Sequence, residues 1–151
     1  MPFGKYKNPN ICDENNFLLI NKLLQKVEIY HGDYSECKKY IGGKTMLYFD
    51  PPYRPITQTA AFLGYSQNGF DDTDQKTLAE FVKSINASDT KIMLSNSDPK
   101  NTDPNDSFFD DLYRDFDINR IQARRMINCQ AEKRGNITEI VVRNYTGEIQ
   151  K

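Results

Sequence analysis

The sequence has no tryptophan, one histidine and three cysteines. The cysteines, at positions 12, 37 and 129, are odd in number and lack the spacing of metal ligands, which excludes a disulfide framework and a cysteine-based metal site. We therefore expect no metal and a reducing, cytoplasmic compartment. No window approaches the roughly twenty apolar residues that a membrane span needs, and residues 1–7 lack the apolar core of a secretory signal. No membrane association is expected.

An excess of positive charge is also missing, because 20 basic side chains stand against 21 acidic ones and the net charge is −1. A self-sufficient nucleic-acid-binding domain is usually basic, so this balance counts against one. The charges are uneven along the chain, however. The segment 98–117 is acidic and the segment 120–134 is basic, which leaves a local basic edge as an alternative.

Apolar patterning predicts alternating strands and helices. Short apolar runs typical of strands lie at 27–30, 46–49, 91–95, 116–123 and 137–144. Between them, helices are expected at 17–24, 34–40, 73–85 and 108–114. The run at 46–49 is continuous, which is typical of a strand buried on both faces.

This order of elements predicts an α/β fold with a mostly parallel sheet, covering helices and a C-terminal antiparallel hairpin. The first sixteen residues are rich in Asn, Pro and Lys, a composition that is typical of an extended arm and not of a packed helix or strand. We therefore expect an arm at 1–16 and a single packed domain at 17–151.

A rigid polar turn, Asp50-Pro51-Pro52-Tyr53, follows the apolar run 46–49. The Asp50 carboxylate is therefore expected at the carboxyl end of a strand, where open α/β sheets bind their ligands. Two consecutive prolines fix φ at about −65° and offer carbonyl oxygens without a competing N–H. The flat ring of Tyr53 would lie at the rim.

Such a turn suits a primary amine on an aromatic ring, as in adenine. The lone pair of that nitrogen is delocalised into the ring, so acceptors must hold its two hydrogens before it can attack an electrophile. The Asp50 carboxylate and a proline carbonyl can accept both, and the negative charge offsets the positive charge that grows on the nitrogen. Tyr53 would stack on the base, which in a duplex must first flip out. The alternative is that the tetrapeptide is only a rigid turn.

Further segments surround this turn in a particular order: His31-Gly32-Asp33-Tyr34, Leu47 to Pro55, Asp74-Gln75, Leu94-Ser95-Asn96-Ser97-Asp98, Arg125-Met126-Ile127-Asn128, Arg134, Glu139 and Asn144-Tyr145. In this order the chain from 27 to 145 resembles the Dam-type family of adenine-specific DNA methyltransferases. The resemblance implies a partial Rossmann-like methyltransferase fold, S-adenosyl-L-methionine as cofactor and double-stranded DNA as partner. It also implies that Asp33 and Asp50 lie beside the cofactor, with Asp33 near its adenine.

Candidates for DNA contacts are Lys5, Tyr6, Thr59, Tyr65, Arg125 and Arg134. The first two belong to the arm, which resembles the segment by which the family's chain returns from its target-recognition domain. The next two follow the tetrapeptide, and the two arginines lie in the polar part of the hairpin. Each pair has a plain alternative: a solvated arm, a loop anchored to the sheet, and a solvated hairpin.

The chain also departs from the family. Its eight glycines never form the Gly-x-Gly turn after an apolar strand that cradles the methionine part of the cofactor, and the target-recognition domain is missing. We therefore expect the C-terminal part of a catalytic domain, inactive alone. Without the strands that flank 27–30 in the family, it should self-associate through that exposed edge.

Three functions remain open. The first is methyl transfer from S-adenosyl-L-methionine to the N6 amine of adenine in DNA. The second is methyl transfer to another amine or to an amide, although asparagine usually replaces the leading aspartate there. The third is a non-catalytic nucleic-acid-binding remnant of the fold, which the missing Gly-rich turn favours.

Overall fold

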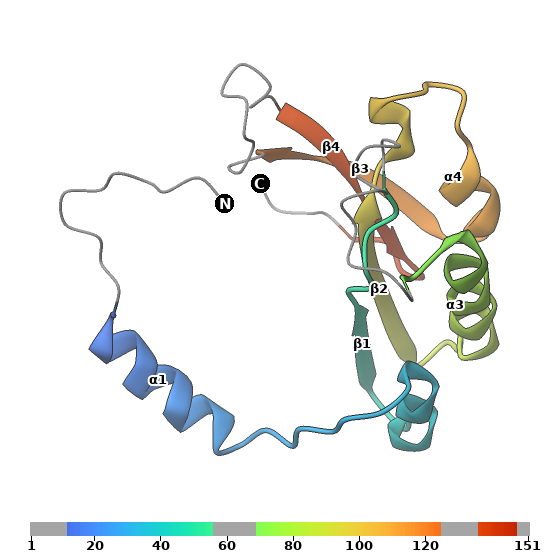
Figure 1. The fold of residues 1–151 in the computed structure, drawn as a ribbon. Helices are drawn as coiled ribbons and strands as arrows, with labels where there is room; N and C mark the ends of the chain where they lie inside the picture. Colours follow the sequence, from blue (N-terminus) through green and yellow to red (C-terminus); the bar gives the residue numbers. More distant parts are fainter. Residues whose placement is uncertain (1–11, 56–68, 125–135, 148–151) are drawn as a thin grey trace, which may run out of the picture. The chain divides into compact units, whose positions relative to one another are not determined.

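The computed structural model describes residues 12–55, 69–124 and 136–147 (Figure 1). The chain forms two compact units, residues 1–36 and 37–151, and each is considered by itself. The six candidates for DNA contacts lie outside the described residues.

The first unit contains helix α1 (Glu14–Leu24), which confirms the helix expected at 17–24. The side chain of Asp13 accepts a hydrogen bond from the backbone N–H of Asn16 and so satisfies one free donor of the first turn. None of the residues of α1 is buried.

The strand expected at 27–30 is absent, because these residues have no regular secondary structure. A strand persists where a neighbouring strand takes up its backbone N–H and C=O groups. No described residue of the first unit supplies such a neighbour, since every strand of the structure lies beyond residue 44. The apolar pattern alone was therefore a misleading signal here.

The helix expected at 34–40 is a short 3-10 helix, η1 (Tyr34–Tyr40). It begins after Asp33, whose side chain accepts hydrogen bonds from the backbone N–H and the hydroxyl of Ser35. These bonds lower the pKa of the Asp33 carboxyl below its usual value. Asp33 is therefore held locally at the start of this turn.

The second unit is built on a four-stranded sheet with the order β1-β2-β4-β3. Its strands are β1 (Thr45–Phe49), β2 (Thr90–Ser97), β3 (Asp117–Arg124) and β4 (Asn136–Arg143). The pair β1–β2 is parallel, whereas β2–β4 and β3–β4 are antiparallel.

The described sheet is thus mixed and does not show the mostly parallel arrangement expected from sequence. The difference arises because the strand expected at 27–30 is absent, which leaves one parallel pair beside the two antiparallel pairs that include the hairpin. Among the described strands, only β1 and β2, which are connected through helix α3, are parallel.

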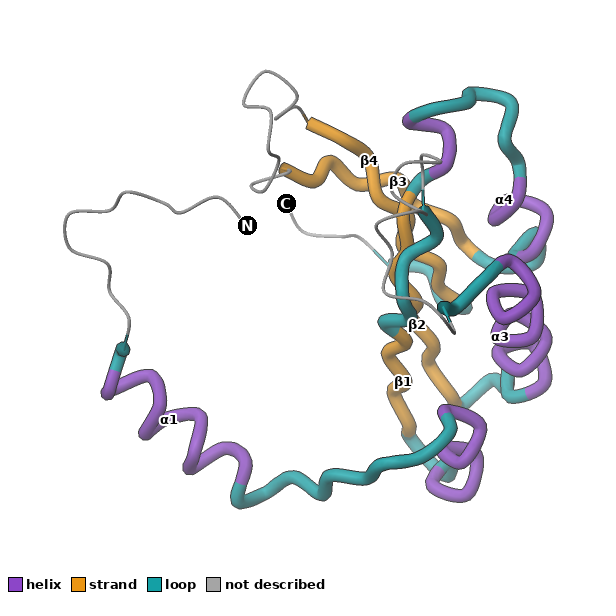
Figure 2. Tube along the Cα trace, in the orientation of Figure 1, coloured by secondary structure: helices purple, strands orange, loops and turns teal. Residues whose placement is uncertain are grey.

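Helices α3 (Asp72–Ser84) and α4 (Phe108–Leu112) lie on the same side of the sheet (Figure 2). The side chain of Asp71 caps α3, as the acidic run before the helix predicts. The ring of Phe81 on α3 meets Phe49 on β1 edge to face, with 6.3 Å between the ring centroids. The buried apolar core includes Leu78, Ala79, Val82, Ile92, Leu94, Phe109, Ile140 and Val142.

The opposite face of β1 is open. Met46 and Tyr48 are 52% and 59% exposed, while Thr45, Leu47 and Phe49 are half-buried. Burial on both faces, expected for this run, is therefore wrong within the described structure. The reason is that α3 and α4 cover one face only, and an apolar run does not reveal how many layers cover it.

Candidate active site

Asp50 directly follows β1 and is exposed, as the sequence predicts. The hydroxyl of Ser95 on β2 donates a hydrogen bond to its Oδ1 atom over 3.1 Å. The hydroxyl oxygens of Ser95 and Tyr48 are 2.8 Å apart, and because Ser95 gives its hydrogen to Asp50, Tyr48 is the donor of that bond. Two hydroxyls in series thus orient the carboxylate.

The two prolines of the turn differ in their partners. The carbonyl oxygen of Pro52 accepts a hydrogen bond from the side-chain amide of Gln75 on α3, at 2.9 Å. No hydrogen bond to the Pro51 carbonyl comes from any residue that the structure describes. Of the two proline carbonyl oxygens, that of Pro51 is therefore the one that can accept a hydrogen bond next to the Asp50 carboxylate.

Gln75 in turn accepts a hydrogen bond from the side-chain amide of Asn96 on β2, at 3.2 Å. Both side chains are completely buried, with 0% exposure. Asn96 uses its oxygen to accept hydrogen bonds from the backbone N–H groups of Arg54 and Ser97, at 2.9 Å each. The buried pair therefore connects the sheet and the helix to the end of the turn.

Arg54, the residue after the tetrapeptide, is held on several sides. Its guanidinium donates two hydrogen bonds to Asp72, at 2.8 and 3.0 Å, and one to Asp106, at 2.8 Å. It also lies 4.2 Å above the ring centroid of Phe108. Its hydrogen bonds to Asp72 raise the pKa of Arg54 further above its usual value. The guanidinium is thus committed to carboxylates of the chain itself.

Tyr53 is 39% exposed and lies between these fixed ends of the turn. Burial raises the pKa of its hydroxyl, a hydrogen bond with Ser95 opposes the rise, and the charges of Glu139 and Asp50 add to it. Tyr53 therefore carries a neutral ring of which part faces solvent, as a stacking surface requires.

Sequence reasoning gave no individual role to Gln75, Ser95, Asn96 or Arg54, which appeared only within the resemblance. A signal was present, however. Gln75 occupies a core position of α3, three and four residues before Leu78 and Ala79, and Asn96 ends an apolar strand. Polar residues at buried positions need partners, and here the partners belong to the candidate site.

The residues present fit part of the cofactor that the resemblance implies. Asp50 has an exposed carboxylate at the sheet edge, and Asp33 lies in the other unit, so their separation is not defined. No glycine among the described residues forms a close cradle at a strand end: a Cβ at Gly42 or Gly43 would meet nothing within 4 Å.

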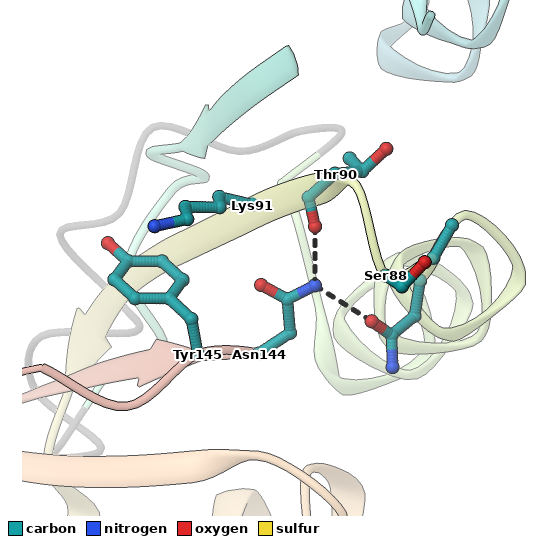
Figure 3. A pocket seen from close by; sticks show the side chains of 7 residues that line it. Ser88, Thr90, Lys91, Asn144 and Tyr145 are labelled. Atoms are coloured by element: carbon teal, nitrogen blue, oxygen red, sulfur yellow. Dashed lines mark hydrogen bonds between the residues drawn. The ribbon is translucent and has the colours of Figure 1, made fainter. Parts of the chain in front are cut away.

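A small polar pocket of about 240 Å³ lies elsewhere, at the amino end of β2 (Figure 3). Asn144 there accepts a hydrogen bond from the backbone N–H of Ile92, at 2.8 Å, and donates to Asn86 and to the carbonyl of Thr90. The amide is thus fully used to join β4 to β2. Ser95 lies five positions after Thr90, or roughly 16 Å along a strand, so this pocket is distinct from the tetrapeptide.

Within the described part of the chain, no helix is long and apolar enough to cross a membrane. The same residues contain no group of three or more His, Cys, Asp or Glu side chains that could hold a metal ion.

Comparison with known proteins points to one class, the DNA methyltransferases. The profile of the family described as D12 class N6 adenine-specific DNA methyltransferase matches residues 1–127, more than half of the chain, and the chain belongs to that family.

Several relatives match almost the whole chain. It is 41% identical over 146 residues to the type II methyltransferase M.MjaIII of Methanocaldococcus jannaschii, covering 96% of this chain and 48% of the relative. It is 36% identical over 147 residues to the type II methyltransferase M1.LlaDCHI of Lactococcus lactis subsp. cremoris, covering 96% and 49%. A DNA adenine methylase of Vibrio cholerae is 29% identical over 142 residues, covering 93% and 48%. The chain spans about half the length of these relatives.

Proposed function

We propose that this chain provides the target-amine side of the active site of a DNA adenine-N6 methyltransferase. The observation that carries the proposal is the pair of acceptors at the sheet edge. The Asp50 carboxylate is oriented by Ser95, and no described residue donates to the Pro51 carbonyl, whereas Gln75 occupies that of Pro52. Two adjacent acceptors match the two hydrogens of the exocyclic amine of adenine.

In this proposal the chain's own residues bind and orient the base. Asp50 and Pro51 accept the two amine hydrogens, which turns the nitrogen lone pair out of conjugation with the ring. The negative charge of Asp50 stabilises the positive charge that develops on the nitrogen. Tyr53 stacks on the base, a contact worth about 1–3 kcal/mol. S-adenosyl-L-methionine would supply the methyl group, with Asp50 and Asp33 as the residues of this chain that lie beside it.

The substrate is proposed to be double-stranded DNA from which the adenine is flipped out. Arg54 is committed to Asp72 and Asp106, so it is not the residue that meets phosphates. Those contacts are assigned to Lys5, Tyr6, Thr59, Tyr65, Arg125 and Arg134. The arm 1–16 would lead back from a target-recognition domain, and the protein would act in the cytoplasm.

The sheet is proposed to be part of a larger, Rossmann-like methyltransferase sheet. β1 is an outer strand of the described sheet, and it runs parallel to β2. Further parallel strands would pair with its free edge and contribute the Gly-rich turn. The edge at 27–30, through which self-association was expected, is not a strand, so for the isolated chain we propose the free edge of β1 instead.

The decisive experiment joins this chain to the N-terminal half of the M.MjaIII relative and measures incorporation of a labelled methyl group into duplex DNA. Mass spectrometry should find N6-methyladenine with the chimera and none with its Asp50→Ala variant. Methylation of amides or of other amines, but not of adenine, would favour the second candidate function. DNA binding without any methylation would favour the non-catalytic remnant.

A further inference from the structure

Three consecutive residues of β2 hold the tetrapeptide: Ser97 donates to the carbonyl of Arg54 at 2.6 Å, and Ser95 and Asn96, which point in opposite directions, hold its two ends. Ser95 lies on the face of the sheet opposite the helices, where it is 7% exposed, and bonds to Asp50, the first residue of the turn. Asn96 lies on the helix-covered face and accepts the backbone N–H of Arg54, just after the turn. Successive side chains of a strand alternate between faces, so a single strand can hold both ends of the turn.

The helix-covered side differs from an ordinary core in one respect. Gln75 and Asn96 have no exposed surface, although each carries an amide with two donor hydrogens and an acceptor oxygen. Burying such groups is costly unless they are hydrogen-bonded. Their bonds run from Asn96 to Gln75 and from Gln75 to the Pro52 carbonyl, at 3.2 and 2.9 Å.

A leucine at either position would fill the core as well, so hydrophobic burial does not explain why two amide side chains occupy positions 75 and 96. Their bonds determine instead which proline carbonyl is occupied. The Gln75 amide holds the Pro52 carbonyl, whereas no described residue donates to the carbonyl of Pro51, so the turn is fixed with the Pro51 carbonyl as the acceptor for a substrate. Because Asn96 accepts the backbone N–H of Arg54, the direction of the backbone after Tyr53 is fixed.

We propose that Gln75 and Asn96 are positioning residues, which fix the Asp50–Tyr53 turn so that Asp50 and the Pro51 carbonyl accept the target amine together while Tyr53 faces the base. This inference rests on the proposed function. Neither residue touches the substrate, and both act through the backbone of the turn.

The first test uses the 151-residue chain itself and requires no catalysis. Hydrogen exchange of the Arg54 amide reports the bond to Asn96. Asn96→Leu removes the acceptor, so exchange should accelerate by about tenfold, which is near the upper end of the range for one hydrogen bond. Asn96→Asp keeps an acceptor oxygen and should preserve the protection of Arg54. Amides of the β2–β4 ladder, such as those of Leu94 and Val142, should stay protected in both variants and show that the sheet is intact.

The second measurement follows the titration of the Tyr53 hydroxyl by NMR, assigned with Tyr53→Phe. In the wild-type chain its pKa is raised by burial. Gln75→Met has a similar length but no amide, so it should release the turn and lower the Tyr53 pKa toward its usual value. The matched control on the same helix is Glu80→Gln, whose side chain is 72% exposed and which should leave both measurements unchanged.

In the methylating chimera, Gln75→Met should reduce kcat by at least about tenfold while KM for the cofactor changes less than about threefold, because the turn holds the target amine and base. Unchanged Arg54 exchange and Tyr53 titration in the variants would overturn the inference. So would a loosened turn with wild-type kcat. If the wild-type chimera transfers no methyl group, the proposed function fails, and the two measurements on the chain still decide whether the pair fixes the turn.

Discussion

Arg54 and Asp72 form a bidentate ion pair in which two guanidinium nitrogens meet two carboxylate oxygens at 2.8 and 3.0 Å. Arg54 directly follows the tetrapeptide, and Asp72 is the first residue of α3. The ion pair therefore joins the turn to the helix. Planar, two-point recognition of this kind is specific to arginine.

This pair predicts that Arg54→Lys is not a conservative change. Lysine keeps the charge but loses the second hydrogen bond to Asp72, the bond to Asp106 and the stacking on Phe108. We expect the free energy of unfolding to fall by about 1.5–3 kcal/mol, the range for one hydrogen bond to a charged group, since the bond to the half-exposed Asp72 adds little. Urea denaturation of the chain measures it. Lys83→Ala breaks an exposed pair with Glu80 and should cost less than about 0.5 kcal/mol; equal losses in the two variants would contradict the prediction.

Acid should destabilise the fold through Asp117. A hydrogen bond from Arg143 is the main cause that lowers the pKa of the Asp117 carboxyl, helped by one from Asn119. A carboxyl with a lowered folded pKa stabilises the protein above its unfolded value, about 3.9, and loses that contribution as the pH falls through the folded value. Arg143 is only 5% exposed, so protonation leaves a buried cation without its partner.

Stability measured by urea denaturation should therefore fall as the pH drops below about 4. Asp117→Asn should remove part of this dependence and be less stable than wild type at pH 7. Glu80→Gln serves as an exposed control, with the same profile as wild type. Parallel pH profiles for Asp117→Asn and wild type would show that Asp117 does not contribute.

Asp50→Ala in the methylating chimera should reduce turnover by at least about a hundredfold, the scale for losing one preorganised electrostatic group. Asp50→Asn keeps the shape of the side chain but loses its charge, so its effect on turnover should exceed its effect on stability. Single-turnover methyl transfer measures the effect on turnover, and thermal unfolding measures the effect on stability. Turnover near that of the wild type would remove Asp50 from the mechanism.

Tyr53 should act through its ring. Tyr53→Phe and Tyr53→Trp should preserve most binding of a flipped base, whereas Tyr53→Ala should weaken it by about 1–3 kcal/mol. The fluorescence of an adenine analogue at the target position of a duplex reports this in the chimera. Equal losses for Phe and Ala would show instead that the hydroxyl is the important group.

The isolated chain should bind S-adenosyl-L-methionine weakly. It has no glycine cradle among the described residues, and each missing hydrogen bond to a charged group forfeits about 1.5–3 kcal/mol. Two such losses remove micromolar affinity, because about 1.4 kcal/mol corresponds to tenfold. Calorimetry should detect little heat at micromolar concentrations, and low-micromolar binding by a monomer would refute the prediction.

The sequence predicted well those elements whose signals are local. The helix at 73–85 followed from the spacing of Leu78 and Val82 behind an acidic cap, and the C-terminal hairpin was confirmed in place. The strand at 27–30 failed because a strand depends on a neighbour, which no local pattern reveals. The bond between Gln75 and Asn96 joins residues 21 positions apart and exists only after α3 packs on β2. Long-range pairs of this kind are the part of the site that periodicity cannot show.

The opposite orientation of Ser95 and Asn96 makes the active site sensitive to insertions and deletions in β2. Adding or removing one residue before Ser95 would exchange the two faces, placing the serine against α3 and the asparagine on the open side. The attachments of the turn to β2 would be lost together, even if the apolar residues of the strand could repack. Methyl transfer would then report the register of β2 more strictly than folding does, because a chain with a shifted β2 could still fold without an ordered turn.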